Sequence, residues 1–360
     1  MQCHLLRSMN HLRPILLYAL LIILVTALRA DPVSSASPSP TPTLAKSKPS
    51  PTPLLLPTPT AANVRYGPSE KQILDFYQAK SKNHGEPTPL LFFTHGGSWQ
   101  GRDKRGDYWL TEQNRIQKFL DEGISIVTIN YRFIWEAQKA GIKPPVSWPI
   151  HDAARALQFT KSKAAEWNLD PNRILISGDS AGACSSLWLA FHDDLANPGS
   201  PDPVEHYSTR SLAAVTWMAQ TTLDPAQMKE WTPNSCYGGH AFGFPMDLNN
   251  KDAAVREKLF SVFLANRDQI LPWIKEYSPY ALASRGAAPV FLYYPNAPAM
   301  GQPQRDPTHT ANFGVKLQEH CHELGLPCEL VYLGSTNVKY PTMEQCILAL
   351  LHPSASETKP

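Results

Sequence analysis

The stretch Ile174-Leu175-Ile176-Ser177-Gly178-Asp179-Ser180-Ala181-Gly182 decides the fold class of this chain. A short apolar run leads into the pattern Gly-x-Ser-x-Gly, and a helix-competent segment, Ala183–Ala190, follows. This order of strand, pentapeptide and helix predicts a nucleophile elbow, because flanking glycines permit a turn tight enough to lift the serine oxygen above the sheet edge. The pentapeptide also arises by chance in long chains, so a second signal is needed.

The second signal lies upstream, where Leu90–Thr94 predicts a buried strand that runs into His95-Gly96-Gly97-Ser98-Trp99. Two glycines at a strand end let backbone N–H groups face a ligand with no side chain between them. Together with the N–H of Ala181, the N–H groups of Gly96 and Gly97 would form an oxyanion hole. An ordinary glycine turn is the alternative, but two such motifs at two strand ends favour the functional interpretation.

At these residues the chain resembles the esterase and lipase branch of the α/β-hydrolase superfamily, which pairs an HGG loop with GDSAG, near hormone-sensitive-lipase-like and feruloyl-esterase-like enzymes. The resemblance extends from about Pro89 to about Leu350. It implies a doubly wound, mostly parallel sheet with helices on both faces and a cap insertion. It also implies that Ser180 is the nucleophile and that Gly96, Gly97 and Ala181 are the oxyanion donors.

The remaining sequence predicts the same α/β architecture. The clearest helical pattern, Ile150–Trp167, precedes the strand that carries the elbow. Strands that alternate with helices of this length indicate a doubly wound α/β sheet. The other predicted strands are apolar, β-branched runs at Ile124–Ile129, Arg173–Ile176, Leu212–Trp217, Val290–Tyr293 and Cys328–Leu333.

A serine nucleophile needs a base and an acid, which the resemblance implies in the order Ser, Asp, His, with the acid after the seventh strand and the histidine after the eighth. Asp306 follows the seventh strand and a proline-rich loop, so we expect it to be the acid. A helix cap ahead of Pro307 is its alternative role. Asp224, after the preceding strand, is the competing candidate and also resembles a helix cap.

The expected histidine is missing from the loop after the last strand, residues 334–342, where Tyr340 takes its position. His352, the only later histidine, lies beyond the final helix, Met343–Leu351. Tyrosine, with an ordinary pKa near 10, cannot serve as a base at neutral pH unless it is strongly perturbed. A shift of a few residues in the alignment of this loop does not supply a histidine either.

Another histidine could substitute from a neighbouring loop. His309 is the best placed because it is beside Asp306, and His240 comes next. Each also fits a residue that makes only local hydrogen bonds, and we expect His95 to fix the shape of the oxyanion loop. If none of them acts as the base, the chain is a catalytically degenerate hydrolase fold used for binding.

The N-terminus predicts export. Basic residues precede an apolar run, Ile15–Leu28, which suits a signal peptide of residues 1–30 better than a membrane span. Residues 31–62, rich in Pro, Ser and Thr, read as a disordered linker, and 63–360 as the α/β-hydrolase domain. We therefore expect a periplasmic or secreted protein, which contacts a membrane only if the signal segment stays uncleaved.

Composition excludes several function classes. With 42% hydrophobic residues and a net charge of +2 in 360 residues, the chain shows no nucleic-acid footprint. No Walker loop or dinucleotide fingerprint implies a cofactor, and no His/Cys cluster has zinc-ligand spacing. A bridge between Cys321 and Cys328 is geometrically conceivable, whereas Cys184 fits a small buried hydrophobe.

These observations predict an exported serine carboxylic-ester hydrolase that forms an acyl-enzyme on Ser180, with Asp306 and His309 as its partners. Its substrates would be small-acyl or polysaccharide-linked esters, by analogy with the family. A non-catalytic binding protein and an acyltransferase are the alternatives. The insertion Asp224–Pro279 is long enough to cover the site, and its aromatic residues are more typical of a cap core than of a sugar platform.

Overall fold

The computed structural model describes residues 56–82, 85–106 and 108–352. The expected signal peptide, 1–30, and most of the expected linker, 31–62, lie outside the described residues. The first strand begins at Ala61, so the folded domain includes the last residues of that linker. None of the helices in the described residues combines the length and the apolarity needed to cross a membrane.

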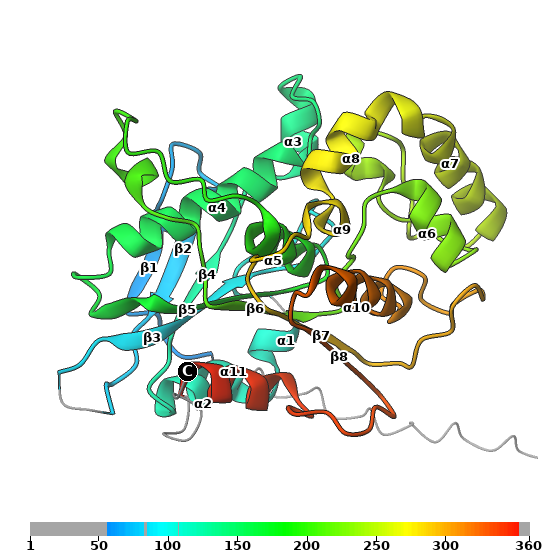
Figure 1. Cartoon of the computed structure of the whole chain (residues 1–360). Helices are drawn as coiled ribbons and strands as arrows, with labels where there is room; N and C mark the ends of the chain where they lie inside the picture. Colours follow the sequence, from blue (N-terminus) through cyan, green and yellow to red (C-terminus); the bar gives the residue numbers. More distant parts are fainter. Residues whose placement is uncertain (1–55, 83–84, 107, 353–360) are drawn as a thin grey trace, which may run out of the picture. The chain divides into compact units, whose positions relative to one another are not determined.

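Eight strands form one sheet in the order β1-β2-β4-β3-β5-β6-β7-β8 (Figure 1). The pairs from β4–β3 to β7–β8 are parallel, whereas β1–β2 and β2–β4 are antiparallel. The predicted doubly wound, mostly parallel sheet is confirmed. The strands are β1 Ala61–Arg65, β2 Ile73–Tyr77, β3 Thr88–Thr94, β4 Ser125–Ile129, β5 Leu169–Asp179, β6 Ala213–Trp217, β7 Val290–Tyr294 and β8 Cys328–Tyr332.

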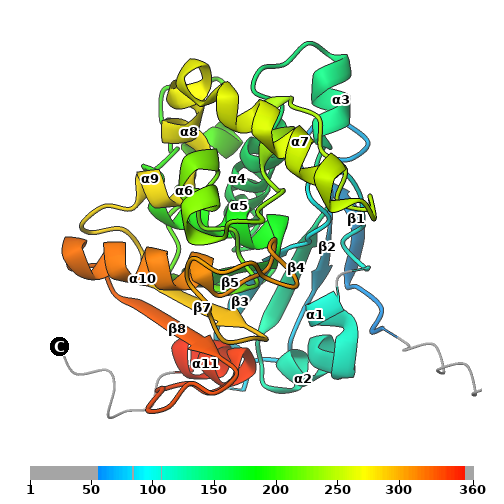
Figure 2. The same cartoon turned by 90° about the vertical axis from the view of Figure 1, so that its right-hand side faces the viewer.

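Helices cover both faces of this sheet. One face carries α4, α5 and α10 and the other carries α1, α2 and α11, as the two views show (Figures 1 and 2). The helices are α1 Tyr108–Thr111, α2 Arg115–Asp121, α3 Ile134–Lys139, α4 Ser147–Ser162, α5 Ala181–Phe191, α6 Pro225–Trp231, α7 Ala253–Ala265, α8 Leu271–Tyr277, α9 Pro279–Leu282, α10 Asn312–Leu324 and α11 Met343–Leu351. Short 3-10 helices are η1 Glu112–Asn114, η2 Pro203–His206, η3 Gly239–Phe242 and η4 Arg267–Ile270.

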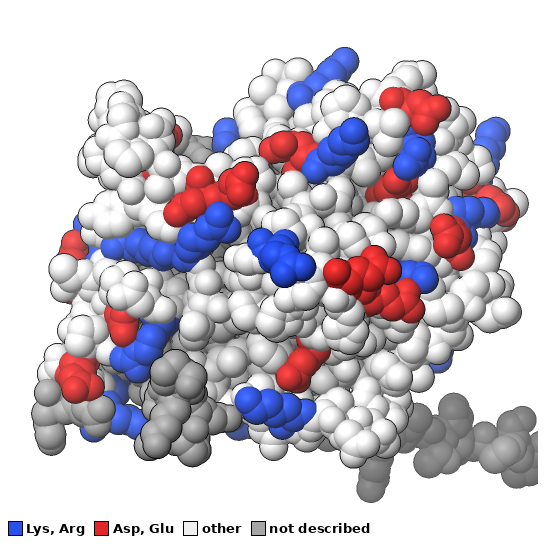
Figure 3. All heavy atoms as spheres, in the orientation of Figure 1, with Lys and Arg blue, Asp and Glu red and all other residues white. Residues whose placement is uncertain are grey.

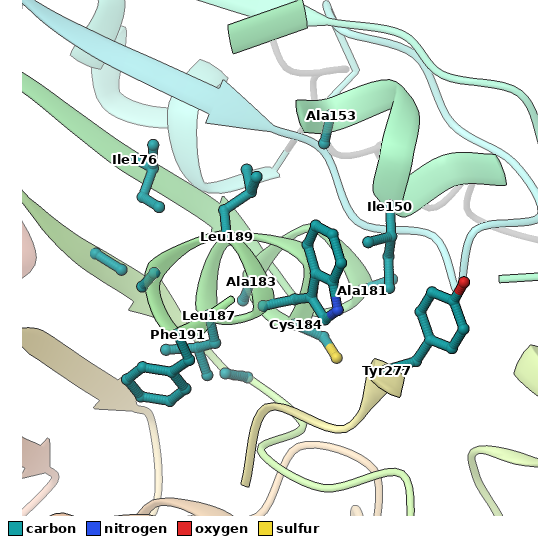
Figure 4. Close-up of a cluster of buried hydrophobic side chains, with 14 of the residues drawn as sticks. Ile150, Ala153, Ile176, Ala181, Ala183, Cys184, Leu187, Leu189, Phe191 and Tyr277 are labelled. Carbon is teal, nitrogen blue, oxygen red and sulfur yellow. The ribbon is translucent and has the colours of Figure 1, made fainter. Parts of the chain in front are cut away.

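The core has two parts because successive side chains of a strand point to opposite faces. On β3, Leu90 and Phe92 belong to the apolar cluster that includes α4 and α5, and Leu91 and Phe93 belong to the cluster that includes α11. Every residue of α5 is buried, which is typical of a helix enclosed on all sides. Figure 4 shows its side chains among those of α4, β5 and the cap.

Some predicted boundaries were wrong. The helix predicted at Ile150–Trp167 is α4, which begins at Ser147 and ends at Ser162. At this end the N–H of Lys163 is shared between the carbonyls of Phe159 and Thr160, as in a last turn that tightens toward a 3-10 helix. The final helix, predicted at Met343–Leu351, is confirmed as α11.

The predicted cap insertion lies between β6 and β7 and contains α6 to α9 (Figures 1 and 2). Trp231, Tyr237 and Phe242 are all buried, so these aromatic side chains form a cap core, as predicted. Outside the cap, Trp135 on α3 is an exposed aromatic residue, with about half of its surface accessible (49%). Lys, Arg, Asp and Glu are interspersed on the face shown in Figure 3.

The cysteines are mainly core residues. Cys184 is fully buried, as predicted, and burial raises the pKa of its thiol. Cys321, near the end of α10, and Cys328, at the start of β8, are buried and free. The bridge considered from the sequence is therefore not formed in this structure.

Candidate active site

Ser180 stands at the sharp turn between β5 and α5. Its backbone angles, φ 53° and ψ −117°, lie in a region that residues other than glycine rarely adopt. Its N–H donates to the carbonyl oxygen of Trp217 at 3.0 Å, which ties the turn to β6. A strained serine at a sharp turn from strand to helix is the geometry of the predicted nucleophile elbow. Such strain persists only where the surrounding structure enforces it.

The structure brings Ser180, His309 and Asp306 together. The Oγ of Ser180 lies 2.9 Å from Nε2 of His309. On the other side of the ring, Nδ1 of His309 lies 2.8 Å from Oδ2 of Asp306. The arrangement fits a neutral imidazole whose Nδ1–H donates to the carboxylate and whose Nε2 accepts from the serine hydroxyl. Both partners of the serine come from the segment between β7 and α10.

Asp306 serves the local turn as well as the histidine. Its Oδ1 accepts from the backbone N–H groups of Thr308, at 3.1 Å, and His309, at 3.3 Å. Partial burial opposes ionisation, but the hydrogen bond from His309 and the backbone donors outweigh it, so the pKa of Asp306 is held below its ordinary value. The alternative predicted from the sequence, a cap ahead of Pro307, therefore coexists with the contact to His309.

The competing acid and base lie elsewhere. Asp224 caps α6 by accepting from the N–H of Ala226, and both of its carboxylate oxygens bond to Arg267 at 2.7 Å. His240 is buried in the cap against the rings of Trp99 and Tyr237. Among the described residues, neither side chain hydrogen-bonds to Ser180, whose Oγ pairs with His309, so the structure does not bring these two candidates to the elbow.

The position expected for histidine is occupied by a core residue. Tyr340 is buried in the cluster that includes α11, and its ring packs on that of Phe291. Its backbone oxygen accepts from the hydroxyl of Tyr293 at 2.9 Å. The tyrosine at this position therefore supports the loop after β8, and the histidine contact to Ser180 comes from the loop after β7.

The glycine loop passes directly beside the nucleophile. A Cβ on Gly96 would lie 3.2 Å from Cβ of Ser180, so only glycine leaves the approach open. Gly97 has φ +96°, which orients its peptide in a way that other residues rarely allow. Ala181 is the first residue of α5, where the N–H has no acceptor within the helix. These three backbone N–H groups are our candidates for the oxyanion hole.

His95 fixes the shape of this loop, as expected. Its Nδ1 lies 2.8 Å from the oxygen of Gly96, and its ring stacks on Tyr131 at 4.4 Å. The hydroxyl of Tyr131 donates to the backbone oxygens of His95 and Gly96. Burial lowers the pKa of His95 to about 4, so the ring is neutral. The sequence analysis did not identify Tyr131, although it follows β4 at the carboxyl edge of the sheet, where such residues converge.

Two cavities flank the elbow. One of about 440 Å³ is lined by Ser98, Asp306 and His309 among others. The other, about 700 Å³, is lined by Asp179, Trp217 and other residues at the carboxyl ends of the strands. Each is thus lined by a neighbour of Ser180, Asp179 in the larger cavity and His309 in the smaller one.

Asp179 and Arg102 form an ion pair that the sequence analysis did not identify. Nη1 of Arg102 lies 3.3 Å from Oδ2 of Asp179. Burial raises the pKa of Asp179, although the charge of Arg102 opposes this effect. Within the described residues no group of three or more His, Cys, Asp and Glu side chains could hold a metal ion. A serine, a base and converging N–H donors are the groups that acyl transfer requires.

A family model supports the same chemistry. The BD-FAE model matches residues 74–294, more than half of the chain. The matched segment includes the HGG loop and Ser180 and ends before Asp306 and His309. The assignment of these last two residues therefore depends on the geometry alone.

Curated relatives are similar to part of this chain, and solved structures are similar to most of it. Esterase LipQ of Mycobacterium tuberculosis is 27% identical over 143 residues, which are 38% of this chain and 31% of that protein. Gut esterase 1 of Caenorhabditis elegans is 32% identical over 109 residues, 29% of this chain and 19% of that protein. The chain thus spans less than a third of the length of these two relatives.

The solved structures agree in fold. A truncated carbohydrate esterase from gut microbiota has a TM-score of 0.53 at 19% identity, covering 78% of this chain and 89% of that one. Esterase 2 of Thermogutta terrifontis, phosphonylated by sarin, has a TM-score of 0.52 at 20% identity, covering 82% of this chain and 94% of that one. At these identities the likeness shows the fold, which is that of the α/β-hydrolases.

Proposed function

Because this chain belongs to the BD-FAE family, in the esterase and lipase branch of the α/β-hydrolase fold, we propose that it is a serine carboxylic-ester hydrolase. The observation that carries the proposal is the pair of contacts at 2.9 Å and 2.8 Å that link Ser180, His309 and Asp306. These contacts supply the base whose absence after β8 motivated the binding alternative. The names of the curated relatives, which are esterases, support the same reaction.

Acylation begins at the serine. The Oγ of Ser180 attacks the ester carbonyl carbon while its proton passes to Nε2 of His309. The carboxylate of Asp306 stabilises the imidazolium that forms, through the hydrogen bond at Nδ1. The negative charge that develops on the carbonyl oxygen is met by the N–H groups of Gly96, Gly97 and Ala181.

Collapse of the tetrahedral intermediate breaks the bond to the alcohol oxygen, and His309 gives its proton to that oxygen as the alcohol leaves. A water molecule then attacks the acyl-enzyme while His309 accepts its proton. The bond between the acyl carbon and Oγ of Ser180 breaks, His309 returns the proton to Oγ, and the acid product is released. The side chain of His309 is about a quarter exposed (26%), so water can reach it. This access favours hydrolysis over transfer to another alcohol, because an acyltransferase must exclude water.

We assign small-acyl or polysaccharide-linked esters as substrates. A carbohydrate esterase among the structures with the same fold supports this class, as do cavities of about 440 and 700 Å³, which accept a sugar-sized group or a short acyl chain. Export to the periplasm or the exterior fits such a polymeric substrate. The apolar run Ile15–Leu28, outside the described residues, is its support.

The test is turnover of a short p-nitrophenyl ester by the full chain, together with labelling by a fluorophosphonate. We expect wild type to be labelled and active, and Ser180→Ala to lose both properties. We expect His309→Gln to reduce kcat by at least about a thousandfold, as loss of a triad base does. Tyr340→Phe, which removes only a hydroxyl from a core residue, should leave kcat unchanged.

Two results would contradict the proposal. Labelling that persists in Ser180→Ala would put the nucleophile elsewhere. An inert wild type that gains activity from Tyr340→His would indicate a decayed triad and favour the binding protein. Thermal unfolding of each variant identifies those that lose activity through misfolding.

A further inference from the structure

The smaller of the two cavities beside the elbow has more basic than acidic side chains in its lining. Its volume is about 440 Å³, and Asp306 and His309 form part of its wall. Arg256 enters it from α7 of the cap, and Arg305 enters it from the loop before α10. Asp306 is the one carboxylate among its lining residues, and its Oδ2 already bonds to His309.

Neither arginine has a carboxylate partner. Among the described residues, no Asp or Glu oxygen lies within 4.0 Å of the guanidinium of Arg256 or Arg305. Arg256 is partly buried and donates to the backbone oxygen of Asn250, which fixes its position on the cap. Arg256 also lies against the thiol of Cys236 in the same lining. A partly buried guanidinium that has no carboxylate partner at a cavity wall favours an anion in that cavity.

The larger cavity on the other flank provides a contrast. It also contains arginines, but Arg102 pairs with Asp179 and Arg115 pairs with Glu344. Both of its arginines are therefore paired within the protein, and its lining includes a further carboxylate, that of Glu112. A third cavity, about 830 Å³, lies near the amino ends of β5 and β6 and so at the opposite edge of the sheet from Ser180. Of these three cavities, the one at His309 combines unpaired positive charge with a place beside the nucleophile.

The position of His309 indicates which part of the ester enters this cavity. In the proposed reaction His309 gives a proton to the leaving alcohol oxygen, so the alcohol portion must lie against this ring. We propose that the cavity selects esters whose alcohol portion carries a negative charge, such as a sugar acid, with Arg256 and Arg305 as the groups that bind it. This inference rests on the proposed ester hydrolysis.

The test compares two acetates of similar shape, 3-carboxyphenyl acetate and the neutral 3-carbamoylphenyl acetate. The readout is the ratio of their kcat/KM values, corrected by the ratio of their rates with hydroxide. We expect wild type to prefer the anionic ester and this preference to fall as salt screens the charges. Arg256→Gln and Arg305→Gln should each lower the ratio about tenfold, which corresponds to about 1.4 kcal/mol.

Control variants separate charge from structure. Arg256→Lys keeps the charge and should retain part of the preference. Lys258→Gln removes a charge from the exposed side of the same helix and should leave the ratio unchanged. A second pair, 4-nitrophenyl hydrogen adipate and 4-nitrophenyl hexanoate, places the charge on the acyl portion instead.

The possible results are distinct. Equal ratios in wild type and Arg256→Gln, with Ser180-dependent turnover of the neutral ester, would overturn the charge preference and leave ester hydrolysis standing. A preference that appears only with the adipate would overturn the assignment to the alcohol portion. No turnover of any ester and no fluorophosphonate labelling of Ser180 would overturn the proposed function itself, and this inference with it.

Discussion

At the scale of single residues, the site depends on a spacing of three. Asp306 and His309 lie on one turn. One carboxylate oxygen of the aspartate accepts from the backbone, and the other contacts the imidazole ring. Oδ1 holds the turn that positions the ring, while Oδ2 contacts Nδ1. One short segment can therefore supply both acid and base. The loop after β8 then needs no catalytic histidine, and a tyrosine of the core, Tyr340, occupies that position.

The two candidate aspartates should respond differently to the same substitution. Asp306→Asn keeps an oxygen for the turn but removes the charge that supports the imidazolium. We expect kcat to fall about a hundredfold, less than for a buried acid because the side chain is half exposed (54%), with little change in stability. Asp224→Asn removes the ion pair with Arg267 and one of the two hydrogen bonds, and should lower the unfolding free energy by about 1–3 kcal/mol with kcat nearly kept.

Enzyme assays and urea unfolding of both variants check this pair. The reverse pattern, an active Asp306→Asn and an inactive but stable Asp224→Asn, would exchange the roles assigned to these carboxylates.

The sequence marks the predicted nucleophile more directly than the predicted base. Ser180 and the HGG loop are marked by contiguous motifs at strand ends, and such local patterns are visible without coordinates. His309 has no motif of its own, since its contact with Ser180 spans 129 residues and depends on the path of the loop after β7. Arg256 was invisible for the same reason, because it reaches the site from the cap.

At the scale of elements, the position of Ser180 depends on how closely α5 approaches β3. A Cβ on Gly182 would lie 2.0 Å from the carbonyl oxygen of Thr94 and 2.6 Å from that of His95. The glycines of the pentapeptide are thus needed for close approach of two backbones. This reason differs from the one predicted from the sequence, turn flexibility, because at this elbow the residue with positive φ is Ser180 itself.

Gly182→Ala should therefore displace α5 and the elbow. We expect the unfolding free energy to fall by about 2–3 kcal/mol, near the upper end for one added methyl group, because the obstructing atoms belong to the backbone. Labelling of Ser180 by a fluorophosphonate should slow as well. Gly199→Ala is the control, since its Cβ would meet only a side-chain atom at 3.6 Å. If Gly182→Ala unfolds like wild type in urea, the close approach has been overestimated.

The parallel strands β3 to β8, including β8 at one edge of the sheet, were predictable from the sequence, whereas the antiparallel strands β1 and β2 were not. Strands β3 to β7 are apolar runs because both of their faces pack in the core, and such runs are easily recognised. The edge strand β1 has no fully buried residue, and β2 includes a buried aspartate, Asp75, so neither reads as an apolar run. The boundaries of α4 were missed because its last turn tightens through local hydrogen bonds.

At the scale of the whole molecule, two buried histidines, one in the main domain and one in the cap, link stability to pH. His95 lies under the oxyanion loop and His240 lies in the cap, and both rings contact aromatic neighbours. Burial lowers the pKa of His95 to about 4 and that of His240 to about 3. An unfolded chain would hold both at their ordinary value near 6.5, so unfolding is linked to proton uptake.

This linkage has a definite sign. As pH falls from about 6.5 toward 4, the unfolded state binds up to two more protons at these two rings than the folded state, so the unfolding free energy decreases. The two rings contribute at most about 2.7 kcal/mol per pH unit, and His151 and His352, whose pKa values burial also lowers, add to the slope. Urea unfolding of the full chain at several pH values between 7.5 and 4.5 measures this slope. His240→Gln should reduce it by up to about 1.4 kcal/mol per pH unit, whereas the exposed His322→Gln should not change it. A stability that stays constant across this range would mean that these rings are already charged, or reached by water, in the folded protein.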